Sequence, residues 1–175
     1  MRILGVETSC DETAAAVIEI MGPRARPRIS VLSSVISSQA KLHAKFGGVV
    51  PNLAKREHQK NLVSVLKMAL RKAGFSNSKF ETRNSKLVQN SKLKILNSIL
   101  EREPDLFARM AKHILPMKPP KIDAIAVTVG PGLAPALWVG VNFARALAYL
   151  WGKPLIPANH MCGHIYYALL KPERR

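Results

Sequence analysis

The feature that most constrains the fold is a continuous apolar run, IDAIAVTV, at residues 122–129. A strand that is apolar on both faces must be covered on both faces, which is typical of α/β proteins. The tripeptide GPG follows at once, and the strongly apolar stretch 133–150 predicts a helix that ends at WG, 151–152. A short strand, PLIPA, is expected next at residues 154–158. This part of the chain therefore predicts a strand, a glycine turn, a helix and a second strand.

The beginning of the chain predicts three strands and a long helix. RILGVE at 2–7 and TAAAVIEI at 13–20 are apolar runs on either side of a polar turn, which indicates a hairpin. ISVLSSVIS at 29–37 predicts a third strand. Between residues 52 and 73 leucine and alanine recur at three-and-four spacing, which predicts an amphipathic helix. This order of elements indicates the α/β class, with a mixed sheet and flanking helices.

A basic segment at residues 76–118 differs from its surroundings. It contains nine Lys and Arg against four Asp and Glu, and its leading part, SNSKFETRNSKLVQNSK, is rich in Ser, Asn and Lys. That composition favours a mobile loop, whereas LKILNSILEREPDLFARMAKHIL predicts one or two amphipathic helices broken near Pro104. We therefore expect an insertion at 76–118, closed by the stiff linker PMKPP at 116–120.

The chain is strongly basic, with 27 Lys and Arg against 11 Asp and Glu and a net charge of +16. Such a field attracts polyanions, and the binding weakens with salt because bound counterions are released. Nucleic acid is the expected partner. The open alternatives are a basic proteome and a fragment whose missing remainder carries the compensating acidic residues.

No segment predicts a membrane or secretory protein. No run of about 18 uncharged apolar residues occurs. The apolar stretch after Met1 and Arg2 is too short for a signal peptide. We therefore expect a cytoplasmic protein without a membrane partner. Cys10 and Cys162 are expected to be free thiols, because a reducing compartment disfavours disulfides.

Two histidines, His160 and His164, lie four residues apart in the motif HMCGH. On a helix this spacing places both imidazoles on one face, about a turn apart, where they can share one metal ion. A third ligand, usually a carboxylate, must come from elsewhere. Cys162 should face away from the metal and is expected to be a core thiol. The open alternative is a pair of surface histidines on a helix.

The polar turn between the first two strands, from Glu7 to Thr13, is a second candidate site, and it includes Ser9, Asp11 and Glu12. Hydroxyl and amide groups in a tight hairpin can hold phosphate oxygens, and carboxylates can bind a cation or orient a nucleophile. The alternative is a polar hairpin whose side chains only satisfy the turn backbone.

Gly130, Pro131 and Gly132 form a third candidate, because glycine allows close approach of a ligand to a helix N-terminus, which favours anions. A purely structural turn is the alternative.

A fourth candidate is the basic, glycine-containing loop at 41–51, which could contact an RNA backbone or be a solvated connection. Arg56, His58 and Lys60 are expected to extend its positive surface.

Four segments together resemble the TsaD family, also called Gcp, in order and relative placement. They are ETSCDET at 7–13, KLHAKFGGVVPNLAKREH at 41–58, TVGPGLAPALWVG at 128–140 and NHMCGH at 159–164. The residues SCDET in the first segment favour the bacterial branch of the family. The resemblance covers residues 1–75 and 119–170. It implies an actin, sugar-kinase and heat-shock-chaperone type of ATPase fold. One ribonuclease H-like half of that fold would be formed by 1–75 and 119–175. Because the family is roughly twice as long, the chain resembles its amino-terminal half and is incomplete.

The resemblance also implies an activity and its residues. TsaD proteins are tRNA N6-adenosine threonylcarbamoyltransferases, which move threonylcarbamoyl from threonylcarbamoyl-AMP to the adenosine 3′ of the anticodon. His160 and His164 match the family's metal ligands, with iron as the first expectation and zinc as the second. Asp11 and Glu12 match its acidic pair, for which we expect roles in substrate orientation or proton handling. The residues expected to bind substrate are Ser9, Gly130, Pro131, Gly132 and Leu133.

The resemblance implies partners and leaves alternatives. It implies tRNA, TsaB-like and TsaE-like proteins, and a C-terminal half that carries the third metal ligand, without which the chain should be a poor enzyme. The family commonly has Glu where Cys162 stands, which affects the surroundings of the ligands and not the ligands themselves. A non-catalytic TsaB-like scaffold is the alternative function, although TsaB lacks the histidine pair. A metalloprotease is disfavoured because the HExxH glutamate is missing.

Overall fold

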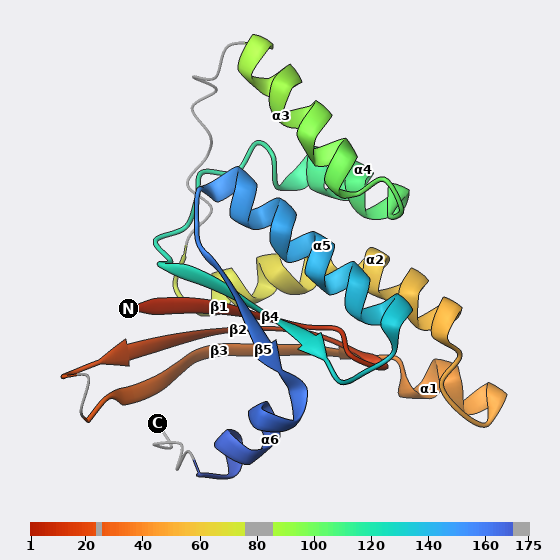
Figure 1. The fold of residues 1–175 in the computed structure, drawn as a ribbon, viewed down its shortest axis with the longest axis vertical. Coiled ribbons are helices and arrows are strands. Elements are labelled where there is room, and N and C mark those ends of the chain that lie inside the picture. Colours follow the sequence, from red (N-terminus) through yellow and green to blue (C-terminus); the bar gives the residue numbers. More distant parts are fainter. Residues whose placement is uncertain (24–25, 76–85, 170–175) are drawn as a thin grey trace.

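The fold was obtained as a computed structural model that describes residues 1–23, 26–75 and 86–169. In this part of the chain one five-stranded sheet is covered on one face by a layer of helices (Figure 1). The strands are β1 (Arg2–Glu7), β2 (Glu12–Met21), β3 (Arg28–Ser38), β4 (Ala124–Gly130) and β5 (Leu155–Asn159). The helices are α1 (Ala40–His43), α2 (Pro51–Lys72), α3 (Lys86–Ile99), α4 (Pro104–His113), α5 (Ala134–Trp151) and α6 (His160–Leu169), with a 3₁₀ turn at Ala44–Phe46.

The sheet is mixed, and its strand order is β3-β2-β1-β4-β5. The first three strands form an antiparallel meander, whereas β4 and β5 run parallel to β1. The pairing of β1 with β4 brings Ile3 opposite Ala124, so the two halves of the chain meet at the centre of the sheet. The α/β class and the mixed sheet with flanking helices are thereby confirmed.

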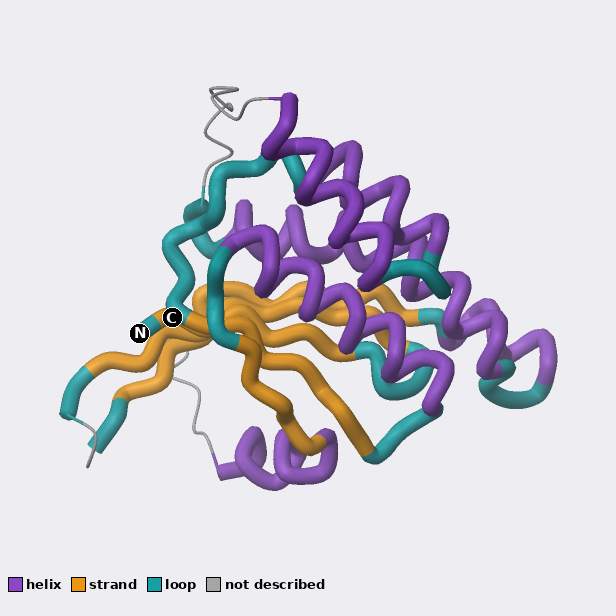
Figure 2. Tube along the Cα trace, turned by 45° about the horizontal axis from the view of Figure 1, so that its top comes forward, coloured by secondary structure: helices purple, strands orange, loops and turns teal. Residues whose placement is uncertain are grey.

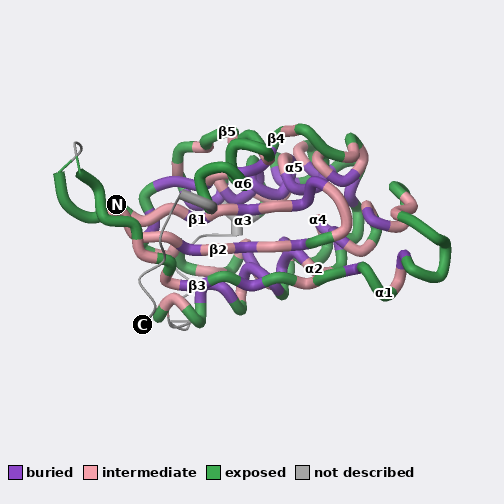
Figure 3. The backbone as a smooth tube through the Cα atoms, turned by 90° about the horizontal axis from the view of Figure 1, so that it is seen from below, coloured by how far each residue is buried: buried purple, intermediate pink, exposed green. Residues whose placement is uncertain are grey.

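The core lies between the sheet and the helices α2 and α5. Alternate residues of β2 are buried, including Val17, which is the period-two pattern of a strand with one covered face. From the helices, Leu66 and Phe143 are fully buried against it. Figure 3 shows the buried residues gathered between these layers, while α6 is exposed from residue 161 to residue 167. The core therefore fixes β1 and β4 against α5, and the site described below lies where these elements end.

The basic segment contributes to this core. As the sequence predicted, it forms two helices separated just before Pro104. They pack against each other, with α3 on α5 and α4 on α2, on the side away from the sheet (Figure 2). Leu96, Leu100, Leu106 and Met110 are at most 1% exposed. The predicted mobile loop covered residues 76–92. Residues 76–85 lie outside the described residues, whereas residues 86–92 belong to α3, so the expectation of a loop is wrong there. The boundaries 76–118 stay a prediction.

None of the helices in the described ranges combines the length and the apolar character needed to cross a membrane. Cys10 and Cys162 are free thiols, as expected.

Candidate metal and substrate site

The two predicted metal ligands face each other at the start of α6. The helix begins at His160, directly after β5, and its first turn is capped by Asn159, whose Oδ1 accepts the backbone N–H of Cys162 at 3.0 Å. The Nε2 atoms of His160 and His164 are 3.1 Å apart, with the rings edge to face. Because a metal–imidazole bond is about 2.0–2.1 Å long, two nitrogens at this separation can bind the same ion.

Glu7, at the end of β1, holds the opposite side of the His160 ring. Its Oε2 lies 3.3 Å from His160 Nδ1 and accepts a 2.5 Å hydrogen bond from Thr128 Oγ1. Its Oε1 accepts the backbone N–H of Ser9 at 2.5 Å. Burial alone would raise the pKa of Glu7, but the hydrogen bonds from Thr128, Ser9 and His160 lower it below its ordinary value. Since an ionised carboxylate only accepts, Nδ1 of His160 carries the proton and Nε2 keeps its lone pair toward His164.

This arrangement fits a metal ion in part. A histidine ligand usually donates its second ring N–H to a carboxylate, as His160 does to Glu7. Glu7 is on the Nδ1 side of the ring and cannot share the ion bound by Nε2. The described residues contain no group of three or more His, Cys, Asp or Glu side chains placed to hold a metal. The pair therefore supplies two imidazole donors, which suit iron or zinc, and needs a further ligand.

Ser9 and the glycine turn, which the sequence predicted as substrate-binding, lie together beside the histidine pair. Ser9 Oγ is 3.2 Å from His160 Nδ1, and the Ser9 carbonyl accepts the backbone N–H of Leu133 at 2.7 Å. A Cβ atom at Gly132 would lie 2.6 Å from that carbonyl oxygen, so the close approach requires glycine. The structure thus joins the end of β1, the turn before α5 and the start of α6.

Asp11 and Glu12 lie on the same hairpin but do not contact the histidines. Glu12 opens β2 and is exposed, and the backbone carbonyl of Asp11 accepts the N–H of Gln39 at 2.8 Å. Neither carboxylate hydrogen-bonds His160 or His164 among the described interactions. Burial and the charge of Asp11 raise the pKa of the Cys10 thiol, which therefore stays protonated. The catalytic roles of Asp11 and Glu12 stay predictions.

His58 was expected on the positive surface, and this expectation is wrong. Arg56 and Lys60 are exposed, but the His58 side chain is 0% exposed. It lies on the face of α2 that packs against the hairpin. His58 Nε2 donates to the Cys10 carbonyl at 3.0 Å, and His58 Nδ1 accepts from Thr13 Oγ1 at 2.8 Å. From its position on α2, His58 therefore holds the turn that carries Ser9 and Asp11.

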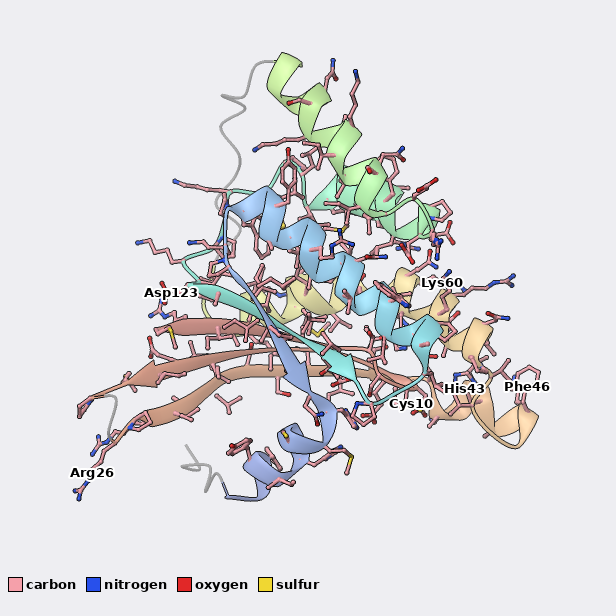
Figure 4. The ribbon with its side chains drawn as sticks, in the orientation of Figure 1. Cys10, Arg26, His43, Phe46, Lys60 and Asp123 are labelled. Carbon is pink, nitrogen blue, oxygen red and sulfur yellow. The ribbon has the colours of Figure 1, made fainter. Side chains whose placement is uncertain are left out.

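A buried chain of hydrogen bonds extends this support to the 41–51 loop. The Val50 N–H donates to His43 Nδ1 at 3.3 Å, and His43 Nε2 donates to Gln39 Oε1 at 3.0 Å. Gln39 Nε2 then donates to His58 Nδ1 at 3.3 Å, so all bonds point the same way, ending at the Cys10 carbonyl. Figure 4 shows Cys10 and His43 at the same end of the sheet. Burial lowers the pKa of His58, which keeps it neutral as this pattern requires.

Cys162 is exposed, so the expectation of a core thiol is also wrong. It lies on α6, whose described side chains from 161 to 167 are all exposed. The sequence placed Glu7 in the polar turn but did not predict its contact with His160, and it missed Thr128. These two residues stand at the ends of two neighbouring parallel strands. Polar residues that end such strands meet at one edge of a sheet, which is the signal that could have identified them.

Comparison with known proteins identifies the same family that the sequence motifs resemble. The sequence model of the family described as "TsaD: tRNA N6-adenosine threonylcarbamoyltransferase" matches residues 30–82 and 106–175. A protein of that name from Thermomicrobium roseum is 43% identical over 166 residues, which are 95% of this chain and 32% of the relative. One from Koribacter versatilis is 41% identical over 173 residues, 99% of this chain and 32% of the relative.

Among solved structures, YeaZ from Pseudomonas aeruginosa is 14% identical with a TM-score of 0.45, over 91% of this chain and 45% of that chain. The chain spans about a third of the length of the curated relatives it matches, so the expectation that it is half of such a protein is wrong. The family model covers more than half of the chain, including the glycine turn and the histidine pair. The chain belongs to the TsaD family of tRNA N6-adenosine threonylcarbamoyltransferases.

Proposed function

We propose that this chain is the amino-terminal part of a metal-dependent tRNA N6-adenosine threonylcarbamoyltransferase. The enzyme would transfer threonylcarbamoyl from threonylcarbamoyl-AMP to the adenosine 3′ of the tRNA anticodon. The observation that carries the proposal is the pair of histidine Nε2 atoms 3.1 Å apart, in a chain of this family. Beside the pair lie Glu7 and Ser9, in hydrogen-bond contact with His160.

His160 and His164 would hold a divalent metal, with iron as the first choice and zinc as the second. Bound there, the ion would act as a Lewis acid on the carbonyl or phosphate oxygens of the adenylate. Glu7 keeps the proton of His160 on Nδ1, so that Nε2 is free to bind the metal.

The remaining residues would orient the substrates. The N-terminus of α5, directly after Gly130 to Leu133, favours the phosphate of the adenylate. During transfer the adenosine N6 attacks the carbamoyl carbon, the bond to the AMP oxygen breaks, and N6 loses a proton. Asp11 and Glu12 are the carboxylates we assign to orienting that amine and accepting its proton.

Further components must complete the site. The third metal ligand and most adenylate contacts are assigned to the remainder of the relatives' length, and TsaB-like and TsaE-like proteins are the proposed partners. The proposed location is the cytoplasm, where tRNA is modified.

The test is nucleoside mass spectrometry on tRNA from cells depleted of their own TsaD. The cells express this chain alone or with a matching C-terminal part. We expect threonylcarbamoyladenosine to return only with both parts, and to be lost in His160→Ala and His164→Ala. Cys162→Ala, on the same turn of α6, is the matched control and should keep the modification. Absence of the nucleoside with both parts expressed and folded would favour the non-catalytic scaffold.

A further inference from the structure

A groove of about 470 Å³ lies beside the glycine turn, between the N-terminal half of α5, the start of α2 and the connection from α3 to α4. Ala134 and Pro135, the first residues of α5, form its near end. These residues follow Leu133, whose N–H is bonded to Ser9. The groove therefore begins next to the substrate site, and its volume lies in the range of small-molecule sites.

One wall of the groove is built by a stretch that the family model does not match. The match omits residues 83–105, and the groove lining includes residues 98, 99 and 101–103. This wall lies over α5, as Figures 1 and 2 show for α3 and α4. The other wall comes from α2 and α5, which lie within the matched ranges. The groove thus combines elements inside the matched ranges with a stretch outside them.

The groove contains three cations. Lys55 and Arg102 form no ion pair or side-chain hydrogen bond within the described part of the chain. Arg145 uses one N–H to donate to Asn142 Oδ1 at 3.2 Å and keeps four further donors. Of the two acidic residues in the lining, Glu103 is 1% exposed and accepts from Asn142. The unpaired cations therefore provide donors for an anion.

An exposed aromatic side chain stands beside these cations. Trp138 on α5 is 59% exposed, whereas Trp151 on the same helix is 5% exposed. Cations that contact phosphates, together with an aromatic face on which a base stacks, are the combination that binds unpaired nucleotides. The charge of the whole chain, +16, favours a polyanion over a free nucleotide.

We propose that this groove binds an unpaired nucleotide of the RNA substrate, with the base stacked on Trp138 and the phosphate on Lys55 and Arg102. The proposal rests on the proposed function, because it places the nucleotide next to the adenosine that is modified. An RNA strand whose target adenosine lies at Ser9 and the glycine turn would enter the groove at Ala134.

The first experiment uses tryptophan fluorescence of the 175-residue chain titrated with an unmodified tRNA anticodon stem-loop. Stacking should quench the wild-type emission, and Trp138→Phe should remove the quench while RNA anisotropy still reports binding. Trp138→Ala should weaken binding about tenfold, as expected for one lost stacking contact. Tyr149→Ala, a partly exposed aromatic on the same helix outside the groove lining, should leave the affinity unchanged.

The second experiment tests the charges. Lys55→Ala and Arg102→Ala should each reduce the slope of log affinity against log salt by about 0.7. Lys94→Ala, an exposed lysine of α3 outside the groove lining, is the matched control and should change the slope less. Glu101→Gln should tighten binding, because it removes a like charge from beside the phosphate.

Four results would overturn the assignment. The first is wild-type affinity in both Trp138→Ala and Arg102→Ala. The second is no binding of the stem-loop to the wild-type chain. The third is equal binding of a fully paired RNA of the same length. The fourth is AMP that quenches Trp138 and displaces the RNA at equal affinity, which would assign a free nucleotide. The proposed function is judged separately, by threonylcarbamoyladenosine in the nucleoside assay, so the two can fail independently.

Discussion

At the scale of single residues, Glu7 controls which nitrogen of His160 is available. It receives hydrogen bonds from Thr128 and Ser9 and faces His160 Nδ1 at 3.3 Å. We predict that Glu7→Gln weakens binding of Zn²⁺ or Fe²⁺ to this chain by about 10- to 100-fold, the usual effect of losing such a carboxylate. Competition with a chromophoric chelator measures this. Glu19→Gln on β2, paired with Arg2, should bind metal as the wild type does. An unchanged affinity in Glu7→Gln would mean that His160 is oriented by other contacts.

His58 makes stability depend on pH. Burial lowers its pKa in the folded protein, against opposing charges of Glu7 and Asp11, while the unfolded chain titrates near the ordinary value of about 6.5. The unfolded state therefore binds the proton more readily, and stability is lost as pH falls below about 6.5. Urea unfolding at pH 7.5, 6.5 and 5.5 should show this loss, and His58→Gln should flatten the profile. Equal slopes in the two proteins would refute a neutral buried His58.

The same residue shows where sequence reasoning fell short. His58, Leu62 and Leu66 repeat every four residues, so His58 lies on the apolar face of the predicted helix. Because His58 lies near Arg56 and Lys60 in the sequence, it was expected on a charged surface. The helical period instead indicates that it lies on the buried face of α2. Its partners Cys10 and Gln39 are 48 and 19 residues away, and no local pattern predicts such contacts.

At the scale of elements, the packing of α5 on β1 depends on the absence of a side chain. A Cβ atom at Gly140 would overlap Thr8 Oγ1, which donates to the Ala136 carbonyl at 3.0 Å. Alanine usually stabilises a helix interior, but here we expect Gly140→Ala to destabilise the fold by about 1–3 kcal/mol through overpacking. Gly163→Ala on α6, where a Cβ meets nothing within 4 Å, should be neutral or stabilising. Urea midpoints compare the two, and a stable Gly140→Ala would show that α5 can shift away from β1.

Most elements were predictable because their periods are strong. The apolar runs of β2 and β4 matched the strands that form, and α2 and α5 appeared within a few residues of their predicted ranges. The helical period alone did not predict that α3 packs on α5 and α4 on α2. Their buried leucines are spaced as on an amphipathic helix, but composition pointed to an inserted segment, and the surface that receives them is made by distant residues.

At the scale of the whole molecule, α6 is an element with little support from the rest of the described chain. It carries both histidines, yet Met161, Ile165, Tyr166 and Tyr167 are 53–70% exposed. Helices with few buried contacts open at low free-energy cost, and a ligand pair on such a helix binds metal weakly because binding must also order the helix. The chain covers about a third of its relatives' length, so the further ligand we propose belongs to the remainder.

We therefore predict that a matching C-terminal part protects α6 and raises the metal affinity together. Amide hydrogen exchange at residues 161–167 should slow when the part is added, and the same addition should tighten metal binding about tenfold or more, as a third ligand joins the histidine pair. The β1–β2 hairpin, already paired along its length, should exchange at the same rate with and without it. Protection of α6 without any gain in metal affinity would mean that the C-terminal part docks on α6 but does not supply the third metal ligand. A gain in affinity without protection would show that α6 is already ordered as Figure 1 draws it.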